Sequence, residues 1–238
     1  MAEYRRRRPD SSTFVLDLLA EQLDALAPDG GRSHDVVDLG GGTGGSATAL
    51  AGRGHRVTVV EPSPDALASL ERRTAEAGLT GRITGRQGDA ADLLDLLGPA
   101  SADVVVCHRV LDVVDSAADA LAAMAAVLRP GGLLSLLVAQ RDAAVLAHAL
   151  AGHLALARQT YADRSRFDHG SVVRLVEAAG FTVVASHGVG AIAALVAESV
   201  LDAQPGARAD LAALESEVSQ DPAFRALAPH LHVLARVD

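Results

Sequence analysis

The 238-residue chain contains no lysine, no tryptophan, one cysteine and only six aromatic residues. A single cysteine, Cys107, excludes an internal disulfide framework and a cysteine-based zinc finger. No run of residues approaches 18 uncharged apolar positions, so the sequence predicts no membrane span. Without lysine, every cationic side chain must be an arginine or a protonated histidine.

The remaining composition is that of an acidic, folded protein. Acidic residues outnumber basic ones 30 to 21, giving a net charge of −9, and 49% of the residues are hydrophobic. This balance excludes global disorder and disfavours nucleic-acid binding over the whole surface. The basic run Arg5–Arg8 is followed by an amphipathic pattern over 14–27 rather than by the apolar stretch of a signal peptide. We expect a cytoplasmic protein without a membrane partner; its oligomeric state stays open.

Short β-branched runs alternate with longer stretches rich in alanine and leucine. The expected strands are 36–39, 56–60, 83–87, 103–107, 133–139, 181–186 and 230–237. The expected helices are 14–27, 46–53, 64–77, 90–97, 116–128, 142–157, 172–179 and a broken helical segment over 192–227. Apolar strands separated by helices are typical of a doubly wound α/β fold, with a mostly parallel sheet covered on both faces. No linker composition interrupts the pattern, so we expect one domain, with helical insertions that form a lid.

A glycine-rich turn follows the first strand directly and opens a helix. It reads Asp38-Leu39-Gly40-Gly41-Gly42-Thr43-Gly44-Gly45. Glycines allow a tight turn and let a ligand approach the main chain closely. The turn satisfies both the dinucleotide pattern G-x-G-x-x-G and the pattern D-x-G-x-G-x-G, so by itself it does not choose between two kinds of nucleotide-containing ligand.

Two acidic residues end the next two strands. Glu61 follows the glycines by about 20 residues, which is the placement of a carboxylate that binds ribose hydroxyls. Asp89 follows the third strand in Gln87-Gly88-Asp89-Ala90. Asp89 could accept a hydrogen bond from an adenine amino group, or it could be the N-cap of the following helix. Together with the glycine turn, these residues predict a nucleoside site at the carboxyl ends of the strands.

The glycine turn, Glu61, Gly88-Asp89, the strand Val104–Cys107 and Leu128–Gly132 together resemble class I S-adenosylmethionine-dependent methyltransferases over residues 35–140. The resemblance implies seven strands with the last one reversed, and S-adenosylmethionine as the cofactor. It divides the domain into an N-terminal arm and helix (1–30), a cofactor-binding core (35–140) and an acceptor side with the last strands (141–238). The cofactor-binding residues that it implies are Asp38, Gly40, Gly42, Gly44, Glu61, Asp89, Ala90 and His108.

A narrower resemblance extends over more of the chain. The segments His108–Val114, Gly131–Leu136, His148 with Ala151-Gly152, and Leu231–Arg236 are similar to the bacterial tRNA 5-carboxymethoxyuridine methyltransferases. Those enzymes esterify a carboxylate on a wobble uridine. The chain departs from them over 158–168, where three arginines and two aspartates replace a basic segment, and at Val113, which replaces an aromatic residue. The acceptor that this resemblance implies is tRNA.

Four further residues are candidates for contact with the methyl acceptor. His108 ends the fourth strand, where it could orient the acceptor or take a proton, or could only line the cofactor. Arg109 and Arg141 follow strand ends and could clamp a carboxylate or phosphate, or could lie at the surface. Tyr161 could stack on an aromatic acceptor or pack within the protein. No metal site is expected, because His230 and His232 share a strand face without an evident third ligand.

We therefore expect an enzyme that transfers a methyl group from S-adenosylmethionine to an oxygen acceptor. One acceptor is a carboxylate on a modified tRNA uridine, and the alternative is a small molecule of secondary metabolism. The end-to-end resemblance favours tRNA, whereas the acidic charge and the altered segment 158–168 favour a small molecule. Readings of another class are a nicotinamide-dependent oxidoreductase and a nucleotide-binding protein without catalysis.

Overall fold

The computed structural model describes residues 11–26 and 33–237, so the arginine run 5–8 lies outside the described residues. The chain divides into two compact units. The larger unit contains Leu19–Val138, Gly170–Ser186 and the chain from His232 onward. The smaller unit contains the described residues up to Leu18, together with Ala139–His169 and His187–Leu231. The helix α1, Ser11–Leu26, contributes to both units.

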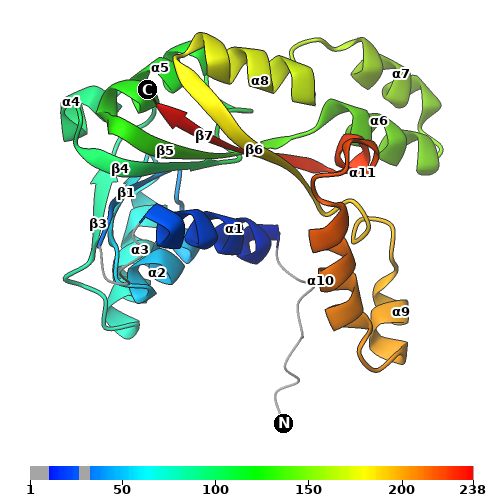
Figure 1. The fold of residues 1–238 in the computed structure, drawn as a ribbon, viewed down its shortest axis with the longest axis horizontal. Helices are drawn as coiled ribbons and strands as arrows, with labels where there is room; N and C mark the ends of the chain where they lie inside the picture. Colours follow the sequence, from blue (N-terminus) through cyan, green and yellow to red (C-terminus); the bar gives the residue numbers. More distant parts are fainter. Residues whose placement is uncertain (1–10, 27–32, 238) are drawn as a thin grey trace. The chain divides into compact units, whose positions relative to one another are not determined.

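A seven-stranded sheet runs in the order β3-β2-β1-β4-β5-β7-β6. Its strands are β1 (Asp35–Leu39), β2 (Arg56–Glu61), β3 (Ile83–Gln87), β4 (Ala102–His108), β5 (Leu128–Ala139), β6 (Phe181–Val189) and β7 (His230–Val237). The first five strands pair in parallel, and β7 lies antiparallel between β5 and β6 (Figure 1). The predicted sheet with a reversed last strand is therefore confirmed.

Helices of the larger unit cover both faces of this sheet, with α2 and α3 on one face and α4 and α5 on the other (Figure 1). Ser63 caps α3, since its hydroxyl accepts a hydrogen bond from the Ala66 amide. The expected helix over 90–97 is shorter in the structure, because Asp89 and Asp92 hold the preceding residues in a turn. The helices are α2 (Gly45–Gly52), α3 (Pro64–Glu76), α4 (Leu93–Leu97), α5 (Ala117–Val127) and α8 (His169–Ala178).

The helices of the smaller unit correct one prediction. The expected single helix over 142–157 is wrong, because Gly152 takes the left-handed conformation at φ 79° and separates two helices. The second helix also continues through residues 158–162, beyond the expected end at 157. Besides part of α1, the described helices of this unit are α6 (Arg141–Leu150), α7 (Leu154–Ala162), α9 (Glu198–Ala203), α10 (Ala207–Val218) and α11 (Pro222–Leu227). The closure of these helices over the sheet as a lid stays a prediction.

The strand β5 begins earlier than expected. Residues 129–132, which lie between the expected helix 116–128 and the expected strand 133–139, belong to the strand. Gly131, at φ 75°, and a register shift between Ala102 and Val104 of β4 form an irregularity through which the strand continues. The central strands carry the core, and Cys107 is fully buried among them. Burial, followed by the charge of Asp38, raises the pKa of the Cys107 thiol to about 12, so this cysteine is an inert core residue.

Within the described residues, no helix is both long enough and apolar enough to span a membrane.

Candidate functional site

The glycine turn between β1 and α2 needs glycine at three positions with positive φ. These are Gly40 at 66°, Gly42 at 55° and Gly44 at 80°. A Cβ atom at Gly40 would collide with Val110, and one at Gly44 would collide with Leu70. At Gly42 the same atom would meet open space. Two of these glycines therefore serve packing, whereas Gly42 leaves the main chain accessible to a ligand.

Glu61 connects the glycine turn to the end of β2. One carboxylate oxygen accepts a hydrogen bond of 3.0 Å from the Gly42 amide, and the other accepts one of 3.0 Å from the Ser63 amide. Each oxygen of an ionised carboxylate has two lone pairs, so each keeps one for a ligand. The side chain is 9% exposed, which limits competition by water. Glu61 is therefore held in place to accept hydrogen bonds from a pair of hydroxyl groups.

Asp38 lies beneath the same turn and is almost fully buried. Its Oδ2 has no hydrogen-bond partner among the described residues, and a Cβ atom on Gly41 would lie 2.5 Å from it. Burial, followed by the charge of Glu61, raises the pKa of Asp38 to about 7, although a hydrogen bond from the Ala47 amide acts in the opposite direction. Asp38 thus supports the turn from below, and its direct contact with a cofactor stays a prediction.

Asp89 follows β3 and is exposed. Its Oδ1 accepts a hydrogen bond of 2.8 Å from the Ala91 amide, and its own amide donates to Asp92 at 3.0 Å. It therefore holds a turn before α4 and is not the N-cap of that helix, which begins only at Leu93. Its second carboxylate oxygen is left for a ligand, beside the buried Ala90.

A pocket of about 720 Å³ in the larger unit brings several of the predicted residues together. Gly40, Glu61, Asp89, Ala90 and Arg109 all line it, whereas Asp38, Gly42, Gly44 and His108 do not. Its other lining residues are Leu39, Pro62, Ala91, Val110, Val113, Val114, Asp115, Ser116, Asp119, Ala120 and Ala123. The pocket therefore lies at the carboxyl ends of β1 to β4, where open α/β sheets bind ligands.

His108 ends β4 next to this pocket-lining Arg109. Its Nε2 atom lies 2.9 Å from the hydroxyl of Ser135 in β5. Burial, followed by the charge of Arg109, lowers the pKa of His108 to about 4, so the ring is neutral at neutral pH. Ser135 in turn contacts His232 in β7, at 3.0 Å. Sequence reasoning missed Ser135 and considered His232 only for a metal site, which it rejected, although alternation along the strands places each residue on a definite sheet face.

A family of methyltransferase domains matches residues 37–136 of the chain. Residues 37–136 are a methyltransferase domain. Every residue predicted to bind the cofactor lies in this domain, from Asp38 to His108. Arg141 and Tyr161, predicted for the acceptor, lie after it.

Two relatives with named activities resemble the methyltransferase domain. A ubiquinone biosynthesis O-methyltransferase of Burkholderia multivorans is 29% identical over 146 residues, which are 61% of this chain and 61% of the relative. The match thus spans less than two thirds of that relative's length. A tRNA 5-carboxymethoxyuridine methyltransferase of Escherichia coli is 25% identical over 228 residues, which are 92% of this chain and 86% of the relative.

A solved structure shows the same fold. It is the 1,6-didemethyltoxoflavin-N1-methyltransferase of Burkholderia thailandensis with bound S-adenosylhomocysteine, and it aligns with a TM-score of 0.58 at 22% identity. The alignment covers 96% of this chain and 79% of that one. This structure supports the fold alone, and the family match together with the two relatives confirms the resemblance to S-adenosylmethionine-dependent methyltransferases.

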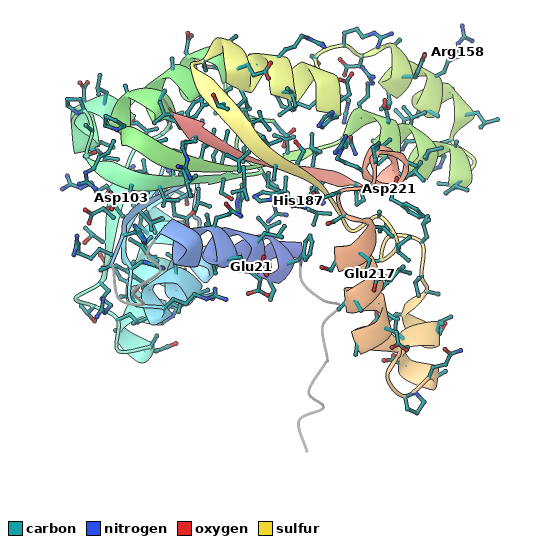
Figure 2. All side chains as sticks on the ribbon, viewed as in Figure 1. Glu21, Asp103, Arg158, His187, Glu217 and Asp221 are labelled. Carbon is teal, nitrogen blue, oxygen red and sulfur yellow. The ribbon has the colours of Figure 1, made fainter. Side chains whose placement is uncertain are left out.

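The two acceptor candidates beyond the methyltransferase domain lie in the smaller unit. The Arg141 guanidinium is buried and already bridges Asp142 at 3.0 Å and Asp168 at 2.9 Å, which favours a structural role. Tyr161 is 58% exposed, and the Arg164 guanidinium lies 5.7 Å from the centre of its ring. Arg158, on the same helix α7, is also exposed, and Figure 2 labels its side chain. Tyr161 therefore stays available for stacking. The guanidinium of Arg141 is already paired with two aspartates, so it is not available to bind an acceptor carboxylate.

Proposed function

We propose that the chain transfers a methyl group from S-adenosylmethionine to an oxygen atom of its acceptor. The observation that carries the proposal is the pocket of the methyltransferase domain, in which Glu61 bridges the glycine turn and the end of β2. The names of the two relatives, one an O-methyltransferase and one a 5-carboxymethoxyuridine methyltransferase, support oxygen as the accepting atom. When bound, the cofactor supplies a methyl group that is already activated on a sulfonium centre.

The residues of the pocket fit this cofactor. Glu61 would accept hydrogen bonds from the ribose hydroxyls with the lone pairs that its two amide partners leave. Asp89 and Ala90 would flank the adenine. The open space above Gly42, which lies outside the pocket lining, would admit the methionyl part. The volume of about 720 Å³ lies within the range of small-molecule sites, roughly 300–1,000 Å³. The protein's part in the reaction is to position the acceptor and exclude water.

Two acceptor classes fit this proposal. A tRNA carboxylate is supported by the match to the tRNA-modifying relative over 92% of this chain. An ionised carboxylate needs no general base, which agrees with a His108 whose pKa is lowered to about 4. A small molecule is supported by the segment 158–168, in which Arg166 pairs with Asp163 at 3.3 Å. The aspartate partly neutralises the arginine and so weakens its attraction for a phosphate group.

Calorimetry tests the cofactor. S-adenosylhomocysteine should bind the purified chain, and NADH should not. Binding of NADH alone would instead support the nicotinamide-dependent oxidoreductase. If S-adenosylhomocysteine binds but no methyl group is transferred to any fraction of tRNA or metabolites, the chain is a binding protein without catalytic activity.

The acceptor is identified by mass spectrometry. Nucleosides from digested tRNA and small metabolites are compared between cells with and without the gene. Loss of a methyl ester from a wobble uridine identifies tRNA, whereas loss of a methylated metabolite with unchanged tRNA identifies a small molecule.

A further inference from the structure

Three polar side chains from neighbouring strands of the larger unit form one hydrogen-bond chain. His108 ends β4, Ser135 lies in β5 and His232 lies in β7, and these strands are adjacent in the sheet. The Ser135 hydroxyl lies 2.9 Å from Nε2 of His108 and 3.0 Å from Nε2 of His232. The two rings stand edge to face, 6.1 Å apart. Ser135 and His232 are fully buried, whereas His108 is partly exposed, so the chain leads from the core to the strand end.

The serine hydroxyl links the protonation of the two rings. It has one proton and is fully buried, and the two ring nitrogens are its hydrogen-bond partners among the described residues, so its proton is satisfied only when it donates to one Nε2 atom and accepts from the other. When both rings are neutral, they therefore hold opposite tautomers. In one arrangement Nε2–H of His108 donates to Ser135, and Nδ1 of His108 is an acceptor. In the other arrangement Ser135 donates to His108, and Nδ1–H of His108 is a donor. In both, Nδ1 is the His108 nitrogen left for a ligand.

We propose that Ser135 and His232 are positioning residues, which hold the His108 ring in one orientation and one tautomer and present its Nδ1 atom to the methyl acceptor. The inference rests on the proposed function, because His108 meets an acceptor only if methyl transfer takes place at the end of β4. His108 then recognises the acceptor by a hydrogen bond and needs no change of charge. A donor at Nδ1 suits an ionised carboxylate, and an acceptor at Nδ1 suits a hydroxyl group.

Two observations favour positioning over packing alone. A buried polar chain costs desolvation that apolar side chains of the same volume would avoid. Moreover, His108, Ser135 and His232 each come from one of the segments that carry the narrower resemblance to tRNA-modifying methyltransferases, although 27 and 97 residues separate Ser135 from its partners. The fold thus brings these three segments together at the hydrogen-bonded side chains of His108, Ser135 and His232.

Nitrogen-15 NMR of histidine-labelled protein tests the inference. Long-range proton–nitrogen spectra report the tautomer of each ring, and the variants His108→Gln and His232→Gln assign the signals. In the full chain we expect His108 and His232 in opposite, single tautomers. Ser135→Ala removes the bridging hydroxyl, so the His108 nitrogen shifts should move to the average of the two tautomers. Ser135→Thr keeps a hydroxyl and should retain the original pattern.

Equal tautomers on the two rings, or unchanged His108 signals in Ser135→Ala, would overturn the proposal. Ser101→Ala is the matched control, because that hydroxyl donates to the Gly98 carbonyl at 3.0 Å and its loss should leave both rings unchanged. If Ser135→Ala is too unstable, Ser135→Cys fills the same volume with a weakly bonding thiol and gives the same readout. The spectra need no cofactor, so they fail or succeed independently of S-adenosylhomocysteine binding, which tests the proposed function.

Discussion

Asp38 and Glu61 lie near the ends of neighbouring strands, but their carboxyl groups differ in burial and in hydrogen-bond partners. Glu61 receives two amide hydrogen bonds and lines the pocket. Asp38 is buried below Gly41 with its Oδ2 unpartnered among the described residues. At the scale of single residues, this contrast favours ligand contact for Glu61 and support of the glycine turn for Asp38. The sequence places both residues at strand ends, but only their neighbours in space distinguish them.

Replacing Glu61 with alanine should weaken binding of S-adenosylhomocysteine by ~1.5–3 kcal/mol, because hydrogen bonds to a charged acceptor are lost. Calorimetry measures the dissociation constant. Glu71→Ala, on the exposed side of α3, is the control and should leave it unchanged. An unchanged constant for Glu61→Ala would remove Glu61 from the ribose site.

The raised pKa of Asp38 makes stability depend on pH. Its pKa is about 7 in the folded chain, whereas the ordinary value for aspartate is 3.8, so between these pH values the folded state holds a proton that the unfolded state releases. The free energy of unfolding therefore falls as pH rises from about 4 to about 7 and then levels off. The contribution of Asp38 to this fall is on the order of 4 kcal/mol. Asp38→Asn should remove this decline.

Urea unfolding at several pH values measures that difference, with the exposed Asp65→Asn as control. Parallel stability curves for Asp38→Asn and the parent chain would contradict the raised pKa.

At the scale of elements, the glycine turn shows how much a local pattern predicts. Its spacing correctly places a strand before it and a helix after it, because only glycine takes the conformations between them without strain. Composition does not tell which glycine serves packing and which leaves room for a ligand. That distinction depends on Val110 and Leu70, which come from distant parts of the sequence.

The two ends of α2 offer a matched pair of substitutions. Gly44→Ala should destabilise the chain by ~1–3 kcal/mol, because φ is 80° and the new methyl group meets Leu70. Gly52→Ala, at the other end of the helix, meets nothing within 4 Å and should stabilise by up to ~1 kcal/mol. Thermal unfolding measures both. Equal changes in stability from the two substitutions would show that the positive φ at Gly44 does not require glycine.

Predictions of element boundaries fail where a single residue decides them. Gly152 divides α6 from α7, although alanine and leucine on both sides continue the helical pattern. Gly131 has the opposite effect, because it lies before the expected start of the strand at 133 and takes a positive φ, yet β5 includes it. In both cases the backbone angle follows from packing that the local sequence does not contain.

At the scale of the whole molecule, the strands could be predicted from the apolar runs, and the reversal of the last strand from the resemblance. The His108–Ser135–His232 chain could not, because it depends on the register of β4, β5 and β7 rather than on any local motif. The acceptor likewise depends on where charges gather in space. A net charge of −9 says little about that distribution.

Salt distinguishes the two acceptors. If the acceptor is tRNA, methyl transfer under subsaturating substrate should fall steeply between 50 and 200 mM salt, on the order of the 10³-fold change in affinity seen when roughly six phosphates are contacted. If it is a small molecule, the rate should change little. Binding of S-adenosylhomocysteine over the same range serves as the control, since its loss would point to damage to the protein rather than to weaker RNA binding.

The burial of Cys107 has a practical consequence for labelling. Its thiol is inaccessible and resists ionisation, so a cysteine introduced at an exposed position such as Arg158 would be the only reactive thiol of the chain. The absence of tryptophan allows a second site-specific probe, because a single introduced tryptophan would be the only source of indole fluorescence. A thiol-linked acceptor dye on α7 and a tryptophan in place of Val113 would then report, without background, on the distance between the smaller unit and the pocket as ligands bind.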